Sequence, residues 1–319
     1  MKVVITGRDF STYNQEAINM LKNEGLEVID YSDRNFGSGT SEEEVLEVIS
    51  DADIAICGLE PYSQYVLKNC LNLKMISRRG IGYDNIDIKT CKKLGITVSR
   101  TVGAVESSVS EAVMAYILYF ARRIDLQNQY MQDHMWKRIM TMGAKSRVLG
   151  LVGFGGIGKE IAKKANAFGM KVVYYCRHPQ KEWDNEYHVS YLPMEELLKI
   201  SDFISINVPL NETTRNMFNL KTLSLMKKGS YLINIARGAI VNEKDLRELL
   251  LNHHIAGAAI DVYDKEPCID SLLVGLDNVI LTPHTAPYTS ENFIQMNNIA
   301  SQNIIDYIHH ELKDIHHLV

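Results

Sequence analysis

The stretch Val148-Leu149-Gly150-Leu151-Val152-Gly153-Phe154-Gly155-Gly156-Ile157-Gly158 decides the fold of this chain. An apolar strand runs directly into glycines spaced as G-x-G-x-x-G, and a helical stretch follows that Gly169 closes. Glycines at this spacing let the chain turn tightly, let the backbone approach a pyrophosphate, and present the free N–H groups of a helix N-terminus. A glycine-rich turn without a ligand is the alternative. Because strand, spacing and helix occur together, we expect a dinucleotide-binding loop formed by Gly153, Phe154, Gly155, Gly156, Ile157 and Gly158.

Short apolar strands alternate with helical stretches on both sides of this loop. Before it, strands are expected at Val3–Ile5, Glu27–Ile29, Ile54–Cys57, Met75–Ser77 and Thr97–Ser99. After Val148–Val152, strands recur at Val172–Tyr175, Phe203–Asn207, Tyr231–Ile235, Ala256–Ile260 and Val279–Leu281. Helices are expected to begin near Asn14, Glu42, Ser63 and Asp87, and to cover about Ser108–Arg123 and Ser290–His310. This alternation predicts an α/β fold with mostly parallel sheets.

The length of the chain predicts more than one domain. A chain of 319 residues exceeds the usual span of one compact domain. We expect two doubly wound parallel-sheet domains that share a cleft, one built from residues 1–101 and 285–319 and the other, with the glycine loop, from residues 102–284. Within the first, Ser41 and Glu44 have the spacing of a capping box that opens the helix near Glu42.

Composition and charge exclude several classes of protein. With 46% hydrophobic and 23% charged residues, the chain has the composition of a globular protein, and no apolar run is long enough to span a membrane. The net charge of −5 offers no excess of cations for nucleic acid. The first residues do not resemble a signal peptide, so a cytoplasmic location is expected. Five scattered cysteines and the pairs His253-His254, His309-His310 and His316-His317 have no metal-ligand spacing, so we expect neither a disulfide framework nor a metal site.

Four further segments carry charged or reactive side chains after strands. They are Arg78-Arg79-Gly80-Ile81-Gly82-Tyr83-Asp84-Asn85-Ile86-Asp87, Asn234-Ile235-Ala236-Arg237-Gly238, Asp261-Val262-Tyr263-Asp264-Lys265-Glu266-Pro267 and Thr282-Pro283-His284-Thr285-Ala286. In order and spacing they resemble the motifs of the D-isomer-specific 2-hydroxyacid dehydrogenase family, and the resemblance covers nearly the whole chain. It implies a flavodoxin-like substrate domain and a Rossmann cofactor domain.

The resemblance implies that Arg237, Glu266 and His284 are catalytic. Reduction of a 2-keto acid needs a carboxylate anchor, a hydride and a proton donor at the carbonyl oxygen. The planar guanidinium of Arg237 can bind a carboxylate through two hydrogen bonds and polarise the adjacent ketone. His284 offers an imidazole, the group most used for proton transfer, and Glu266 beside it would favour the imidazolium and fix its orientation. The cofactor would supply the hydride.

Other site residues follow from the same resemblance. The backbone around Gly80, Ile81 and Gly82 is expected to hold the substrate carboxylate, with Arg78, Arg237 and His284 also contacting the substrate. Besides the glycine loop, the expected cofactor contacts are Cys176, Arg177, His178, Val208, Pro209, Thr214, Ile235, Ala236, Arg237, Asp261, His284 and Ala286. The Ser108–Arg123 segment and the region of Trp136 resemble the dimerising part of the family, so a homodimer is expected.

The sequence leaves more than one substrate, and one other class of protein, open. Arg78 matches a substrate contact of the 3-phosphoglycerate dehydrogenase branch and Arg79 adds a second charge, which favours a dianionic or phosphorylated acid such as 3-phosphoglycerate. Glyoxylate, hydroxypyruvate and pyruvate are alternative substrates. A corepressor-like, nucleotide-sensing binding protein is the alternative of another class. A formate dehydrogenase would carry glutamine in place of Glu266, and a phosphite dehydrogenase would carry a lysine near Arg78, so both are disfavoured.

The residues after Val172–Tyr175 favour NADP over NAD. An NAD site usually ends this strand with Asp or Glu, which accepts a hydrogen bond from the ribose 2′-hydroxyl. Position 176 is Cys, and Arg177 and His178 follow it. A carboxylate there would repel a 2′-phosphate, whereas an arginine can bind it. The sequence therefore predicts NADP as the preferred cofactor, with NAD as the alternative.

Overall fold

The computed structural model describes residues 1–13, 15–314 and 317–318, so the predictions that fall on Asn14 and His316 lie outside the described residues. The chain divides into two compact units. The first unit is Met1–Val105 with Tyr288–Val319, and the second unit is Glu106–Pro287. The boundaries expected from the sequence, after residues 101 and 284, lie a few residues before these.

The first unit is built on a parallel five-stranded sheet. Its strands are β1 (Lys2–Ile5), β2 (Glu27–Asp30), β3 (Ile54–Cys57), β4 (Met75–Arg78) and β5 (Thr97–Arg100). Their order is β2-β1-β3-β4-β5, and every neighbouring pair is parallel. This is the flavodoxin-like order, in which the direction of winding reverses between β1 and β3. The loops at the carboxyl ends of these two strands therefore lie at the topological switch point.

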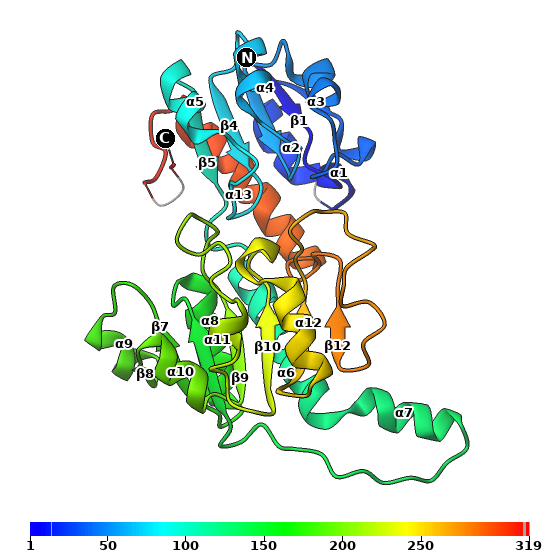
Figure 1. The fold of residues 1–319 in the computed structure, drawn as a ribbon. Helices are drawn as coiled ribbons and strands as arrows, with labels where there is room; N and C mark the ends of the chain where they lie inside the picture. Colours follow the sequence, from blue (N-terminus) through cyan, green and yellow to red (C-terminus); the bar gives the residue numbers. More distant parts are fainter. Residues whose placement is uncertain (14, 315–316, 319) are drawn as a thin grey trace. The chain divides into compact units, whose positions relative to one another are not determined.

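Helices cover the sheet of the first unit (Figure 1). They are α1 (Phe10–Tyr13), α2 (Gln15–Asn23), the 3₁₀ helix η1 (Ser32–Arg34), α3 (Glu42–Ile49), α4 (Gln64–Asn69), α5 (Ile88–Leu94) and α13 (Ser290–Ile308). The predicted capping box is confirmed: the Ser41 hydroxyl accepts from the Glu44 N–H, and the Glu44 carboxylate accepts from the Ser41 N–H. The C-terminal helix α13 packs on α2 and β4, which returns the end of the chain to the first unit.

The second unit contains a parallel seven-stranded sheet. Its strands are β6 (Val148–Val152), β7 (Lys171–Tyr175), β8 (Val189–Tyr191), β9 (Phe203–Ile206), β10 (Ser230–Asn234), β11 (Ile255–Ile260) and β12 (Val279–Leu281). The order β12-β11-β10-β9-β6-β7-β8 reverses between β6 and β9, so the glycine-rich loop after β6 lies at the switch point. Two doubly wound parallel sheets confirm the predicted α/β fold class.

The second unit has helices that flank this sheet and one, Ile124–Gln132, that extends away from it (Figure 1). They are α6 (Glu106–Arg122), α7 (Ile124–Gln132), α8 (Gly156–Ala167), α9 (Lys181–Glu186), α10 (Met194–Ile200), α11 (Leu220–Leu223), the 3₁₀ helix η2 (Gly238–Ile240) and α12 (Glu243–Leu251). Helices α6 and α8 pack against each other, whereas α7 buries none of its residues. In the described part of the chain, no helix is both long enough and apolar enough to cross a bilayer.

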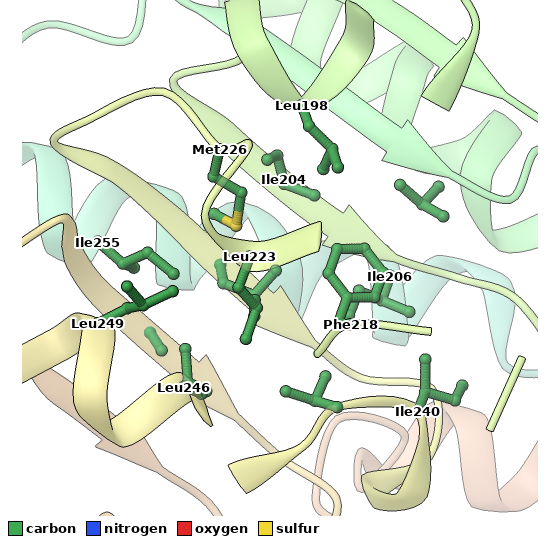
Figure 2. Close-up of a cluster of buried hydrophobic side chains, with 14 of the residues drawn as sticks. Leu198, Ile204, Ile206, Phe218, Leu223, Met226, Ile240, Leu246, Leu249 and Ile255 are labelled. Carbon is green, nitrogen blue, oxygen red and sulfur yellow. The ribbon is translucent and has the colours of Figure 1, made fainter. Parts of the chain in front are cut away.

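A large apolar core lies between the sheet of the second unit and the helices on one of its faces (Figure 2). Phe218, Ile206 and Leu246 are among its fully buried members. Burial of one such side chain stabilises the fold by about 1.5–3 kcal/mol. The strands and helices whose ends carry polar loops are therefore held rigidly, which is what a precise site requires.

Candidate active site

The glycine-rich loop joins the carboxyl end of β6 to the N-terminus of α8. Gly153 has φ +100°, and a Cβ on it would lie 2.7 Å from the backbone of Asn207, so both conformation and space require glycine there. A Cβ on Gly158 would lie 2.6 Å from the carbonyl oxygen of Gly153. Gly155 differs, because its φ is −83° and no neighbouring described atom lies within 4 Å of its Cβ position. Glycine at position 155 thus leaves room for a ligand to approach the backbone.

The remaining loop residues fit a pyrophosphate site through their backbones. Helix α8 has 12 residues, and its first N–H groups have no partner within the helix, so they can donate to an anion. The side chain of Phe154 is buried and stacks on Tyr174 with 4.3 Å between ring centroids. Phe154 can therefore contact a cofactor only through its backbone. Gly156 and Ile157 begin the helix itself.

The residues after β7 leave a cationic side chain exposed. Cys176 is half-buried, while Arg177 and His178 are exposed. Among the described residues, the guanidinium of Arg177 has neither a hydrogen bond nor an ion pair. The nearby carboxylate of Asp184 accepts a 3.2 Å hydrogen bond from the Tyr174 hydroxyl, which holds it within α9. The residue that directly follows β7 is Cys176, so no carboxylate stands at that position.

The loop after β9 uses its polar side chains internally. The Thr214 hydroxyl donates to the Pro209 carbonyl at 2.7 Å and accepts from the Asn211 N–H at 2.8 Å. Val208, beside Pro209, packs against the apolar core. The structure therefore assigns Thr214 first to closing this turn, and any contact of its hydroxyl with a pyrophosphate would compete with the bond to Pro209.

The turn after β10 presents Arg237. Asn234 is almost fully buried; its side-chain amide donates to the Arg237 carbonyl at 2.9 Å and accepts from the Ala236 N–H at 3.1 Å. The Arg237 guanidinium also donates to the Ala236 carbonyl at 2.7 Å. Gly238 is required by space, since a Cβ there would clash with the backbone of Tyr263. Ile235 is buried between these contacts. The turn thus holds the base of Arg237 firmly.

Asp261, at the end of β11, organises the loop that carries His284. Its fully buried carboxylate accepts hydrogen bonds from the Thr282 hydroxyl at 2.6 Å, the Thr285 N–H at 2.8 Å and the Ala286 N–H at 2.9 Å. Its backbone carbonyl accepts from the His284 N–H at 2.8 Å. The carboxylate of Asp261 thus positions this loop, and the contact of Asp261 with a nicotinamide stays a prediction.

His284 and Glu266 form a close pair. Nδ1 of His284 lies 2.8 Å from Oε2 of Glu266, and the other carboxylate oxygen accepts from the Tyr263 N–H at 3.0 Å. His284 has φ +55°, a left-handed conformation that is uncommon for a residue with a side chain and that is often found at functional sites. Burial acts to raise the pKa of Glu266, but the hydrogen bonds and charge of His284, the Tyr263 N–H and Arg237 together hold that pKa below its ordinary value. Glu266 is therefore a carboxylate that supports an imidazolium.

The first unit carries the other predicted site residues, after β4. Gly80 has φ +140°, and its N–H donates to the buried Thr101 hydroxyl at 2.8 Å. This N–H is already used within the protein, so the expected binding of a substrate carboxylate falls mainly on the neighbouring N–H groups and stays a prediction. Among the described residues, the N–H groups of Ile81 and Gly82 make no hydrogen bond with the protein. These two N–H groups are the ones that can bind a carboxylate.

The two arginines before this loop are buried. Arg78 is 5% exposed and its guanidinium donates to the Arg79 carbonyl. Arg79 is 7% exposed; it donates to the Asn297 side chain at 3.2 Å and to the Arg8 carbonyl, and its guanidinium lies 4.7 Å above the ring of Phe293. Burial and the neighbouring Arg78 lower the pKa of Arg79 to about 10. Arg79 thus joins α13 to the sheet, which is a different role from the predicted second substrate charge.

A protein-family comparison decides the identity of the chain. The model of the D-isomer specific 2-hydroxyacid dehydrogenase, NAD binding domain, matches residues 114–286, more than half of the sequence. The chain belongs to the D-isomer specific 2-hydroxyacid dehydrogenase family. The family predicted from the motifs is confirmed, and this member of it is an oxidoreductase with an NAD-binding domain.

Individual relatives agree with this family. The chain is 36% identical over 278 residues to the glyoxylate reductase of Thermococcus litoralis, covering 84% of each chain. It is 37% identical over 255 residues to the hydroxypyruvate reductase of Thermotoga maritima, covering 78% of this chain and 82% of the relative. It is 35% identical over 281 residues to the D-3-phosphoglycerate dehydrogenase of Methanocaldococcus jannaschii, covering 87% of this chain and 54% of that longer relative.

Solved structures extend the similarity to cofactor complexes. The D-lactate dehydrogenase of Aquifex aeolicus, complexed with NAD and lactic acid, superimposes with a TM-score of 0.86 at 27% identity, covering 100% of this chain and 99% of that one. An acyclic imino acid reductase (Bsp5) in complex with NADPH and D-Arg gives a TM-score of 0.87 at 28% identity, covering 100% of both chains. Relatives with this fold therefore bind either nicotinamide cofactor.

Three residues within the motifs hold the proposed catalytic side chains in place, although the sequence alone assigns them no role. They are Asn234, Tyr263 and Thr282, which belong to the three catalytic motifs. Asn234 shapes the turn of Arg237, the Tyr263 N–H orients Glu266, and Thr282 binds Asp261. Their places within the motifs were a usable signal. Their partners could not be identified, since each hydrogen bond depends on the folded loop.

Proposed function

We propose that this dehydrogenase interconverts a short 2-keto acid and the corresponding D-2-hydroxy acid, with Arg237, Glu266 and His284 as its catalytic residues. The observation that carries this proposal is the 2.8 Å contact between His284 Nδ1 and Glu266, on a loop that Asp261 holds in a left-handed conformation. A histidine paired with a carboxylate and held by a buried aspartate is the arrangement that proton transfer requires.

The pair assigns a proton donor. Because Glu266 occupies Nδ1, Nε2 is the nitrogen of His284 that can donate a proton to the carbonyl oxygen of the substrate during reduction, or accept it during oxidation. The nicotinamide cofactor, when bound, supplies or takes up the hydride at the adjacent carbon. Arg237 would bind the substrate carboxylate and polarise its ketone.

The proposed substrate lacks a phosphate group. The phosphate hypothesis depended on two free arginine charges, whereas Arg79 is bonded to Asn297 and to the Arg8 carbonyl. Glyoxylate and hydroxypyruvate are consistent with the names of the relatives that match most of this chain. A phosphorylated acid is the second candidate because a D-3-phosphoglycerate dehydrogenase is 35% identical, and Arg78 would then bind the phosphate.

The proposed cofactor is NADP. The support is the exposed guanidinium of Arg177 directly after a half-buried Cys176, at the position where a carboxylate would repel a 2′-phosphate. Gly155 and the N-terminus of α8 would hold the pyrophosphate of either cofactor. NAD has no 2′-phosphate for Arg177 to bind, so only the NADP proposal depends on this residue.

The proposed assembly is a homodimer. Helix α7 buries no residue, and the segment around it exposes large apolar side chains: Ile124 at 66%, Trp136 at 79% and Met140 at 98%. A surface of this kind is typical of an interface between subunits. Light scattering should give twice the mass of the 36.2 kDa chain, and a monomer mass would contradict the proposal.

One experiment tests the reaction and its specificity together. Initial rates are measured with glyoxylate, hydroxypyruvate, pyruvate and phosphohydroxypyruvate, each with NADPH and with NADH. We expect turnover that is fastest with an unphosphorylated acid and NADPH. Failure of every 2-keto acid would contradict the reaction and favour the nucleotide-sensing alternative, whereas a clear preference for phosphohydroxypyruvate would support the second candidate substrate.

A further inference from the structure

Tyr116 reaches the catalytic loop from a helix that carries none of the predicted site residues. It lies on α6, and its hydroxyl is 2.8 Å from Oγ1 of Thr282, although 166 residues separate the two in sequence. Both residues belong to the second unit, and Thr282 is two positions before His284. The contact therefore joins the middle of a long packed helix to the loop of the proposed proton donor.

The direction of this hydrogen bond follows from the next one. The Thr282 hydroxyl lies 2.6 Å from the Asp261 carboxylate, which can only accept at neutral pH. A threonine hydroxyl has a single proton, so that proton is committed to Asp261. The Tyr116 hydroxyl must then be the donor to Thr282. The proton order Tyr116 to Thr282 to Asp261 is fixed, and burial raises the pKa of Tyr116, which keeps the phenol protonated.

The network ends on the backbone that shapes the histidine loop. The same carboxylate oxygen of Asp261 that binds Thr282 also accepts from the Thr285 N–H at 2.8 Å, and its other oxygen accepts from the Ala286 N–H at 2.9 Å. His284 lies between these anchors with φ +55°. Charge-assisted bonds to one carboxylate thus hold both sides of His284, and Thr282 orients that carboxylate.

We propose that Tyr116 is a positioning residue for His284, acting through Thr282 and Asp261. The inference rests on the proposed role of His284 as proton donor. The Tyr116 hydroxyl directs the Thr282 proton to Asp261, and Asp261 in turn fixes the left-handed loop. Loss of the hydroxyl lets Thr282 rotate toward another acceptor, so the imidazole is held less well for proton transfer. Tyr116 is not among the expected cofactor contacts, so we expect loss of its hydroxyl to act on the rate more than on cofactor binding.

The test removes one hydroxyl at a time. Tyr116→Phe keeps the ring that packs in α6, and Thr282→Val keeps the β-branched shape. We expect Tyr116→Phe to lower kcat about three- to tenfold, the range of a modest coupling within one hydrogen-bond network, while KM for the cofactor and the melting temperature change little. The double variant should lose no more activity than Thr282→Val alone, since both changes break the same connection.

A matched control is available on the same helix. Tyr119 is 41% exposed and its hydroxyl donates to Asp125 at 3.0 Å, away from the catalytic loop. Tyr119→Phe should leave kcat unchanged. The proposal is overturned if Tyr116→Phe keeps the wild-type kcat, if it lowers only the melting temperature, or if the two losses multiply in the double variant.

A second readout does not need turnover. In protein labelled on histidine, the ring signal of His284 is identified by its absence from His284→Ala. Tyr116→Phe should shift or broaden that signal, whereas Tyr119→Phe should not, and an unchanged signal would contradict the coupling. If the wild type reduced no 2-keto acid but Tyr116→Phe still shifted the His284 signal, the proposed function would be contradicted and the positioning role of Tyr116 would be supported.

Discussion

The two units share a doubly wound parallel architecture, but their equivalent switch-point loops differ in what fills them. After β6 of the second unit, the space beside Gly155 is open, and a 12-residue helix follows. After β1 of the first unit, a Cβ on Gly7 would lie 3.3 Å from Nε of Arg79. The loop after β6 can admit a pyrophosphate, whereas Arg79 of the protein itself occupies the space beside the loop after β1.

One glutamate in each unit shows the same difference. Glu60 of the first unit is fully buried and accepts hydrogen bonds from the Gly58 N–H and the Thr6 hydroxyl, so it stabilises a loop. Glu266 of the second unit keeps 18% of its side chain exposed and pairs with His284. The same topology therefore gives a loop that can bind a ligand or a loop that only stabilises the fold. The outcome depends on whether the polar groups of the loop are already used within the protein. Substitutions in these loops test whether the available polar groups decide the function of each unit.

The largest effect is expected for His284→Ala. Loss of the proton donor should reduce turnover of a 2-keto acid about 10²–10⁴-fold. Cofactor affinity, measured by fluorescence titration, should be retained because the glycine loop is untouched. His253→Ala is a matched control, since His253 is exposed and has the same φ of +55°. Near-normal rates in His284→Ala would refute the assignment of the proton donor.

A smaller effect is expected for Gly155→Ala. The added Cβ meets no described atom of the protein within 4 Å, so the melting temperature should change little. It would occupy the space of a pyrophosphate, and loss of one or two charge-assisted hydrogen bonds should raise the cofactor Kd about 10- to 100-fold. Unchanged affinity would mean that the open space has no ligand.

Two alanine variants calibrate this result. Gly143→Ala also adds a Cβ to open space but lies away from the loop, so it should change neither affinity nor stability. Gly153→Ala should reduce both, because φ is +100° and the Cβ would lie 2.7 Å from the backbone of Asn207. The pair separates a glycine kept for a ligand from one kept for the fold.

Much of this comparison was predictable from the sequence. Alternating apolar runs predicted every strand except β8, whose three residues Val189-Ser190-Tyr191 form a short sheet edge without a long apolar pattern. The glycine spacing predicted the loop at the switch point of the second unit. The capping box at Ser41 was also predictable, since its two partners are three residues apart.

The contacts that decide which groups are available could not be predicted. The Gly80 N–H is used by Thr101, and the guanidinium of Arg79 is bonded to Asn297, 218 residues away. Such partners are set by how distant segments pack, and no local pattern encodes them. Charge counting along the sequence therefore overestimated the cations available to a substrate.

A moderate effect is expected for Arg177→Ser. Removal of one exposed guanidinium should lower kcat/KM with NADPH roughly tenfold, the size of one charge-assisted contact, and leave the value with NADH nearly unchanged. Cys176→Asp should shift the preference further toward NADH, because a carboxylate repels a 2′-phosphate and can accept from a ribose hydroxyl. A wild-type preference of tenfold or more for NADH would contradict the NADP proposal before any variant is made.

The smallest effect on rate is expected for Glu266→Gln. A glutamine can still accept the Nδ1 hydrogen bond, so the loss of charge assistance alone should lower kcat roughly fivefold, corresponding to about 1 kcal/mol. Without the carboxylate, the protonated form of His284 loses its anionic partner. The pH profile of reduction should therefore shift toward acid relative to the wild type. A profile that does not move would show that Glu266 only orients the ring.

The free energy of unfolding gives an independent check on the pair of Glu266 and His284, because it depends on pH through the carboxylate. Folding holds the pKa of Glu266 below its ordinary value, so the folded state binds this proton less well than the unfolded state. The stabilisation is then fully present above the ordinary carboxyl pKa of about 4.3 and is lost as pH falls through the lower folded-state value. Urea unfolding of wild type and Glu266→Gln should differ most near neutrality and converge in acid. A stability difference that stays constant from pH 7 down to about pH 3 would show that the carboxylate's charge contributes nothing to the pairing.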